Sequence, residues 1–273
     1  MGRKRNSPVN VLFGWVRRQS MKVKVFLGVT TVLSCLVMLK LAVRNYDHFF
    51  VAAEAIHAAG ILVLVYKLMT QKTCSGLSLK TQELTAMFLV VRLICSSVME
   101  KDIHTVLDFA ALVASLWVIY MIRFKLKYTY IKQLDNMPLY YLAVPCAVLA
   151  LLVKPHTSHH SVFGVLWAFC VYLEAISVYP QLRLMQNAKM VEPFTAHYVF
   201  ALGAARFLGF AHWVLVVYET GGTSLFLRGS SFLWLPAILI SKIVQTFILA
   251  DFCYYYVKSA MYGQLLTRLP SPV

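Results

Sequence analysis

The sequence predicts an all-α polytopic membrane protein. Of its 273 residues, 60% are hydrophobic and only 14% are charged, whereas a soluble domain carries about 25% charged residues. The hydrophobic residues form continuous runs of about 15–25 residues, not the alternation that the strands of a membrane β-barrel require. Because lipid offers no water to satisfy free backbone groups, each run is expected to be a helix.

Eight apolar segments are long enough to cross a hydrocarbon core of about 30 Å. In chain order they are Val25–Val43, Phe49–Met69, Thr81–Met99, Ile103–Ile122, Pro138–Val153, Ser161–Tyr179, His197–Tyr218 and Phe232–Val257. The fifth segment is near the lower length limit. The first follows a basic arm, so a cleaved signal peptide is the alternative there, but no small-residue cleavage site follows Val43. We therefore expect a retained span.

Positive charge alternates along the connectors between these segments. The N-terminal arm, every second connector after it and the C-terminal tail hold 18 of the 26 Lys and Arg residues, and the intervening connectors hold four. By the positive-inside rule, both termini face the cytosol. The net charge of +15 thus reflects basic cytosolic loops, and no nucleic-acid partner is expected. The implied parts are an arm (1–24), an additional helix (25–43), a bundle (49–257) and a tail (258–273).

Ionisable residues within the spans are candidates for function, since a charge at the bilayer centre costs at least ~2.5–3.5 kcal/mol on insertion scales. Arg92 and Arg206 lie mid-span, where a guanidinium can hold a carboxylate through two parallel hydrogen bonds. Glu54, Asp108 and Lys242 lie nearer to span ends and fit structural ion pairs or snorkelling. The near balance of acids and bases predicts mutual pairing inside the bundle. With Lys40 near a span end left aside, these candidates are Glu54, His57, Arg92, Asp108, Glu174, Arg206, Lys242 and Asp251.

An internal repeat links the two mid-span arginines. A shift of 114 residues superposes Thr81 on Thr195 and Arg92 on Arg206. Transporter-like folds built from repeats place their binding site between the repeats, near the midplane of the membrane. We therefore expect the two arginines to point into one cavity.

Histidines offer two further candidates. His57 lies deep in a span and can change charge between pH 5 and 8, as a proton-sensitive switch or as a core histidine bonded to a neighbour. The connector KPHTSHH, with its three histidines at positions 156, 159 and 160, is a zinc or proton site, or a solvated polar loop. Motifs for hydrolysis, nucleotide binding and dinucleotide binding are absent from the sequence, so we expect neither enzymatic activity nor a cofactor or metal.

Five strings in order carry a family resemblance. They are TCSGLSLKTQ (73–82), LWVIYMIRFK (116–125), VYLEAISVYPQL (171–182), TAHYVFALG (195–203) and IVQTFILADFCYYYV (243–257), and they resemble the KDEL receptors, which retain lumenal proteins of the endoplasmic reticulum (ER). Tyr179-Pro180-Gln181 is also similar to the PQ-loop signature of SWEET sugar transporters. The resemblance runs from about Phe49 to Pro270. It implies a seven-helix bundle of two three-helix repeats and a linking helix. Because it does not cover Met1–His48, the apolar segment Val25–Val43 is expected to be one extra N-terminal transmembrane helix.

The resemblance also implies roles for individual residues. These are carboxylate binding by Arg92 and Arg206, ligand packing by Trp167 and Trp213, proton sensing by His57 and Glu174, and a structural or trafficking role for Asp251. Other positions depart from the family. Phe50 and Val216 replace arginines, Cys95 and Gly164 replace acids, Ala205 and Gly209 replace tyrosines, and His212 replaces an asparagine. Because each lost charged contact removes roughly 1.5–3 kcal/mol, we expect standard KDEL or HDEL signals to bind poorly.

The function implied by the resemblance is retrieval. Such receptors bind the C-terminal signals of escaped lumenal proteins in the acidic Golgi and return them to the ER with the COPI coat. The expected location is therefore the ER and Golgi membrane. The tail lacks the lysine cluster that supports coat binding, which weakens the expectation for COPI. The alternatives are a PQ-loop-type small-solute or proton-coupled transporter, a diverged member that no longer binds the standard signal, and a non-binding scaffold.

Overall fold

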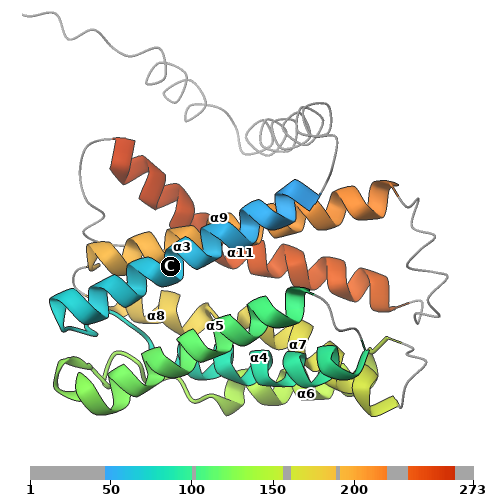
Figure 1. The fold of residues 1–273 in the computed structure, drawn as a ribbon, viewed down its shortest axis with the longest axis horizontal. Helices are drawn as coiled ribbons and strands as arrows, with labels where there is room; N and C mark the ends of the chain where they lie inside the picture. The colour runs from blue at the N-terminus through green and yellow to red at the C-terminus, as the bar shows by residue number, and fades with distance from the viewer. Residues whose placement is uncertain (1–46, 100–102, 156–160, 189–190, 220–232, 262–273) are drawn as a thin grey trace, which may run out of the picture. The chain divides into compact units, whose positions relative to one another are not determined.

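A computed structural model describes residues 47–99, 103–155, 161–188, 191–219 and 233–261. The chain divides into two units, Met1–His48 and Phe49–Val273, and the predicted first span, Val25–Val43, lies outside the described residues. The elements of the described part are helices (Figure 1). They are α3 (Asp47–Tyr66) with a π-helical end η1 (Lys67–Gln71), α4 (Leu79–Met99), α5 (Ile103–Tyr120) with η2 (Met121–Lys125), η3 (Lys127–Thr129), α6 (Tyr140–Leu152), α7 (Ser161–Ile176), α8 (Tyr179–Asn187), α9 (Pro193–Glu219) and α11 (Trp234–Met261).

Each of the seven predicted spans within the described part is a helix, which confirms the all-α polytopic fold. Six of the helices are long and apolar enough to cross a membrane, and α6, with 13 residues, is shorter. One boundary differs from the prediction. The span expected to end at Tyr179 breaks after Ile176 and continues as α8. Pro180 stands in the first turn of α8, where its missing N–H would have no partner within the helix in any case.

Large apolar side chains cover the outside of the bundle. Phe109 and Phe247, for example, are 60% and 74% exposed. A soluble monomer rarely leaves extended apolar surface open to water, so these faces suit contact with lipid. Inside, two apolar clusters hold the helices together, one around Leu64 and Val199 and the other around Leu84 and Leu173.

Under the 114-residue shift, α3 corresponds to α7 and α4 corresponds to α9. Each of the two repeats packs its first helix, α3 or α7, on the second helix of the other repeat, α9 or α4. α7 packs against α4, and it also contacts α6 and α11. Correspondingly, α3 approaches α9 so closely that a Cβ atom on Gly60 would lie 3.0 Å from Cβ of Ala201. Figure 1 shows α3 beside α9 and α7 beside α4. This exchange places residues of both repeats around one central space.

Two sets of polar contacts, at positions related by the 114-residue shift, connect the helices of one repeat to those of the other. In the first, which we call the ionic junction, Nζ of Lys67 lies 2.8 Å from Oε2 of Glu192 and donates to Oγ1 of Thr195 at 2.7 Å. Glu192 also accepts hydrogen bonds from N and Oγ1 of Thr195, at 2.8 and 2.7 Å, in the first turn of α9. The end of α3 is thereby tied to the start of α9.

The second junction, the amide junction, ties α8 to the start of α4. Oε1 of Gln181 accepts from N of Ser78 at 2.8 Å, and N of Gln181 donates to Oγ1 of Thr81 at 2.9 Å. Oγ of Ser78 in turn accepts from N of Thr81 at 3.1 Å. Lys67 corresponds to Gln181, Glu192 to Ser78 and Thr195 to Thr81 under the same shift. The predicted repeat is therefore present as a repeated pattern of contacts.

Lys67 also corrects one detail of the charge pattern. The charge pattern places it among the cations of a connector, but its side chain is 0% exposed and forms an ion pair. Removing it from the count leaves 17 connector cations against four, so the asymmetry between alternate connectors persists.

Candidate functional site

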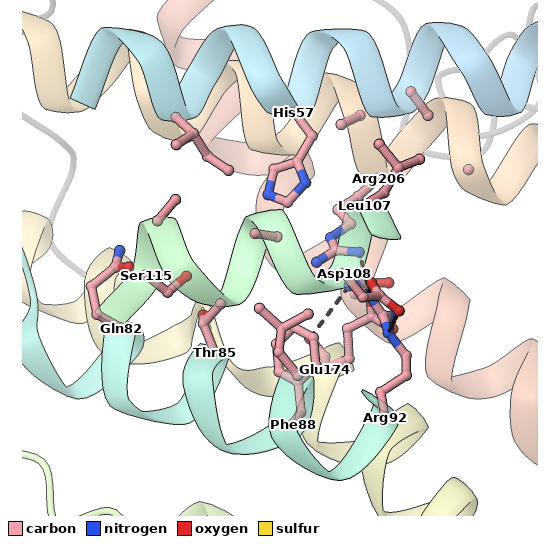
Figure 2. A pocket seen from close by; sticks show the side chains of 18 of the residues that line it. His57, Gln82, Thr85, Phe88, Arg92, Leu107, Asp108, Ser115, Glu174 and Arg206 are labelled. Atoms are coloured by element: carbon pink, nitrogen blue, oxygen red, sulfur yellow. Dashed lines mark hydrogen bonds and ion pairs between the residues drawn. The ribbon is translucent and has the colours of Figure 1, made fainter. Parts of the chain in front are cut away.

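The central space between the exchanged helices is a cavity of about 340 Å³ (Figure 2). Helices α3, α4, α5, α7, α9 and α11 all contribute to its wall. Most of the lining is apolar or aromatic, and a group of ionisable side chains gathers on one side. The ionisable lining residues with acidic or basic side chains are His57, Arg92, Asp108, Glu174, Arg206, His212 and Lys242.

Arg92, from α4, faces two carboxylates. Its Nε donates to Oδ2 of Asp108 at 2.9 Å, and its Nη2 donates to Oδ1 of the same carboxylate. Its Nη1 lies 3.4 Å from Oε2 of Glu174. The guanidinium carbon also stands 5.4 Å from the centre of the Phe88 ring, in the range of a cation–π contact. The Arg92 head group is thus held from three directions.

Glu174, from α7, lies at the centre of the cluster, with only 8% of its side chain exposed. Its Oε1 accepts from Nη1 of Arg206 on α9. Nζ of Lys242, on α11, is 3.9 Å from its Oε2. One carboxylate therefore joins three cations from three helices, which is how a buried acid remains charged despite the loss of solvation.

The cluster carries an excess of positive charge. Among the described residues that line the cavity, three cations (Arg92, Arg206 and Lys242) face two acids (Asp108 and Glu174). In a space of low dielectric, an uncompensated charge is costly. The arrangement is suited to receiving one anionic group, and a carboxylate matches the planar fork of an arginine best.

The structure brings together five of the residues predicted to form the site, four of them with ionisable side chains. Arg92 and Arg206 point into one cavity, as the repeat predicts, and both contact Glu174. The His57 ring points from α3 into the same cavity (Figure 2). The mutual pairing of acids and bases inside the bundle, expected from their near balance, is also present.

The remaining predicted site residues are divided. Trp213 lines the cavity. Trp167 instead packs against the apolar cluster around Leu173 and is not among the described residues of the cavity wall. Asp251 is exposed on α11, away from the cavity lining. The side chains of Glu54, Phe50 and Val216 and the histidine-rich connector at 156–160 lie outside the described residues.

Two of the positions at which the resemblance implies larger family side chains lie in the cavity wall. Ala205 and Gly209 of α9 both line it, and a Cβ atom added at Gly209 would meet nothing within 4 Å. Space is therefore present where the family carries larger side chains. Cys95 and Gly164, two further departures, are buried.

Two charged cavity residues are not among the site residues that the sequence predicts. The places of Asp108 and Lys242 near span ends favour structural pairing, yet both line the cavity and contact the central cluster. Their presence inside spans was a signal. What the sequence lacked was the rotation of α5 and α11 about their axes, which decides whether a side chain faces lipid or the cavity.

Comparison with known proteins gives consistent matches. A family model described as ER lumen protein retaining receptor matches residues 73–216. The chain is 32% identical over 223 residues to an ER lumen protein-retaining receptor of Caenorhabditis elegans, covering 81% of this chain and 98% of the relative. Similar proteins with the same description occur in Dictyostelium discoideum (30% identity, 80% and 97% coverage) and Petunia hybrida (33%, 77% and 94%).

Proposed function

This chain belongs to the ER lumen protein-retaining receptor family, and we propose that it binds the C-terminal retention signals of escaped lumenal proteins. In this proposal it takes up signals of the KDEL or HDEL type in the Golgi for return to the ER. It acts as a receptor and not as an enzyme. The single observation that carries the molecular part is the excess positive charge of the cavity, where Arg92, Arg206 and Lys242 face Asp108 and Glu174.

The terminal carboxylate of the signal is the group that this excess charge suits. A C-terminal peptide ends in a planar anion, and a guanidinium binds it through two parallel hydrogen bonds. Arg92 and Arg206 are the proposed carboxylate ligands, and Trp213 offers an apolar surface within the same cavity. The cavity, at about 340 Å³, is large enough for the end of a peptide, though not for a folded protein.

We assign the response to pH to His57. The cationic groups of the cavity, Arg92, Arg206 and Lys242, oppose a further positive charge on this ring in the empty state. A bound carboxylate adds negative charge and so favours the protonated ring. Binding and proton uptake are then linked, and affinity rises as the pH falls. The charged or titratable groups around the ring in the cavity wall are Arg92 (α4), Asp108 (α5), Glu174 (α7), Tyr198, Arg206 and His212 (α9), and Lys242 (α11).

A peptide-binding measurement tests this proposal. Purified full-length protein is titrated with a library of C-terminal tetrapeptides at about pH 5.5 and about pH 7.4, on either side of the usual histidine range. We expect binding of free-acid peptides at the lower pH, with standard KDEL and HDEL signals weaker than the best library member. Arg92→Lys keeps the charge but loses the planar fork, so binding should fall markedly.

Two controls connect the result to the groups named here. Amidation of the peptide's C-terminus should weaken binding as much as Arg92→Lys does. His57→Ala should flatten the dependence on pH while leaving a carboxylate-dependent affinity. An amidated peptide that binds as tightly as the free acid would exclude the carboxylate from recognition.

The proposed topology places both termini in the cytosol, with eight spans including Val25–Val43. It is supported by the distribution of basic residues between alternate connectors. A glycosylation acceptor added at the N-terminus should stay unmodified, whereas one placed beside His159 should be modified. COPI-dependent return from the Golgi belongs to the same proposal, and a tail without a lysine cluster predicts weaker coat binding than a lysine-bearing tail grafted in its place.

A further inference from the structure

Asp108 already makes, with Arg92, the contact that a ligand's carboxylate would need. The Arg92 guanidinium presents Nε and Nη2 side by side, and the two oxygens of Asp108 accept one hydrogen bond from each. This two-bond contact is the strongest geometry available between arginine and a carboxylate. The remaining nitrogen, Nη1, is directed to Glu174.

Asp108 is well placed to hold this position. It is carried by α5, which packs against α4, so its carboxylate is tethered beside Arg92. Its side chain is 15% exposed and that of Arg92 is 25% exposed, and both residues line the cavity. A peptide terminus entering the cavity therefore meets an Arg92 fork that is occupied by an acid of the same chain.

We propose, on the basis of the receptor function above, that Asp108 is an internal competitor which sets the affinity of this cavity for a C-terminal carboxylate. A bound ligand displaces Asp108 from the Nε and Nη2 face of Arg92 and takes over its two hydrogen bonds. An external carboxylate has to win against a tethered one, whose local concentration is high because α5 holds it in place. Asp108 thus weakens every free-acid ligand to a similar extent, regardless of its side chains.

The other half of the cluster shows why the competition is local. Arg206 and Lys242 share Glu174, and that carboxylate is also directed to Arg92. Among the described residues, neither Arg206 nor Lys242 donates two parallel hydrogen bonds to one carboxylate, as Arg92 does to Asp108. Removing the charge of Glu174 would raise the positive charge of the cavity as much as removing that of Asp108, but it would leave the Arg92 fork occupied.

Comparison of Asp108→Asn with Glu174→Gln separates release of the Arg92 fork from a simple change of charge. The probes are the best-binding free-acid tetrapeptide, a peptide ending in KDEL, and the C-terminal amide of each. We expect Asp108→Asn to bind the free acids roughly tenfold more tightly than the unchanged protein, the size of one charge-assisted hydrogen bond. The amides should gain little. Glu174→Gln should gain less, and adding Arg92→Lys to Asp108→Asn should remove the gain.

Glu83→Gln, which also removes one acidic charge but at a residue outside the described cavity lining, is the matched control and should leave affinity unchanged. Asp108→Ala provides a second variant, and monodispersity with helical circular dichroism verifies folding of each. Peptide free acid should also raise the thermal unfolding temperature of Asp108→Asn more than that of the unchanged protein. Equal affinity of the two proteins for free acids, or equal gains for acids and amides, would overturn the competition but leave the receptor function standing. No binding of any free acid by either protein would overturn the receptor function itself.

Discussion

The ionic and amide junctions occupy equivalent places in the two repeats but use different chemistry. In the ionic junction a fully buried ammonium, on Lys67, bonds to Glu192, to Thr195 and to the backbone oxygen of Ser75. In the amide junction a fully buried Gln181 side chain accepts from N of Ser78 and donates to the backbone oxygen of Gly76 at 2.7 Å. Each junction therefore joins helices of different repeats. Each also bonds to the connector between η1 and α4, at Ser75 or at Gly76.

The difference teaches that the repeat retained a hydrogen-bond pattern rather than residue identities. A neutral amide satisfies its partners without a net charge, so its burial costs little once it is bonded. A buried ammonium needs its carboxylate, because an unpaired charge in the interior is strongly destabilising. We therefore expect the ionic junction to be more sensitive to loss of one partner and to pH than the amide junction.

The largest expected effect comes from Glu192→Gln, which leaves the buried Lys67 ammonium without its counter-charge. Removing one member of a buried ion pair costs about 3–5 kcal/mol, and we expect a loss near the lower end because Glu192 is 22% exposed. Thermal unfolding of the protein purified in detergent measures it. Glu83→Gln is the control, since its partners Lys80 and Arg123 are 30% and 54% exposed and pairs with exposed partners contribute about 0–1 kcal/mol.

The comparison can be sharpened by giving the ionic junction the chemistry of the amide junction. Lys67→Gln combined with Glu192→Ser reproduces the residues found at Gln181 and Ser78. Because a buried pair can be replaced by neutral groups at little cost, the double variant should be more stable than Glu192→Gln alone. A double variant that is less stable than the single one would show that the junctions are not equivalent.

The next largest effect is expected in the amide junction itself. Gln181→Leu has a similar size but leaves N of Ser78 and O of Gly76 without their side-chain partner. Each unsatisfied buried group costs about 1–3 kcal/mol, and because the bond to Gly76 is only partly buried we expect a loss near the lower end for two groups, about 2–3 kcal/mol, in thermal unfolding. Arg183→Leu, at an exposed position of the same helix α8, is the control. A loss for Gln181→Leu larger than that for Glu192→Gln would reverse the expected order.

A smaller effect is expected from Gly76→Ala, in the connector that both junctions share. Gly76 has φ of +78°, a left-handed conformation, and a non-glycine residue there costs about 1–2 kcal/mol. A Cβ atom would approach Glu192 and Thr195 no closer than 3.5 Å, so backbone strain and not a clash is the cause. Gly209→Ala, where a Cβ atom meets open space, should not show this loss.

The smallest effect is the dependence on pH. Burial by itself would raise the pKa of the Glu192 carboxyl, but hydrogen bonding and charge from Lys67, with hydrogen bonds from Thr195, hold that pKa below its ordinary value of 4.5. The carboxylate therefore stabilises the fold above about pH 4.5, and this contribution disappears as the pH falls through the lowered pKa. The difference in stability between the unchanged protein and Glu192→Gln should narrow as the pH falls through that acidic range. If the difference in stability between the unchanged protein and Gln181→Leu narrowed over the same pH range, the assignment of this effect to Glu192 would be wrong.

The sequence by itself determined the class of fold and the positions of the helices. Continuous apolar runs have one solution in lipid, because free backbone groups find no water there, and the predicted spans Thr81–Met99 and Ile103–Ile122 begin within two residues of α4 and α5. The break before α8 was not predicted, although Pro180 marked it. A proline in the first turn of a helix and one that interrupts a helix look alike until the neighbouring helices are placed.

For the cavity, the sequence alone identified the ionisable residues within the spans, whose charge is costly to bury without a partner. The spacing of Arg92 and Arg206 predicted that both point into one cavity. Only the tertiary structure decided the partners. Whether Asp108 and Lys242 face lipid or the cavity depends on the rotation of α5 and α11, and the packing of α3 on α9 and α7 on α4 decides which helices meet. Hydropathy is the same for either rotation and either pairing. The electrostatic energy of a buried charge differs between these arrangements, because it depends on atoms a few ångströms away that come from other parts of the chain.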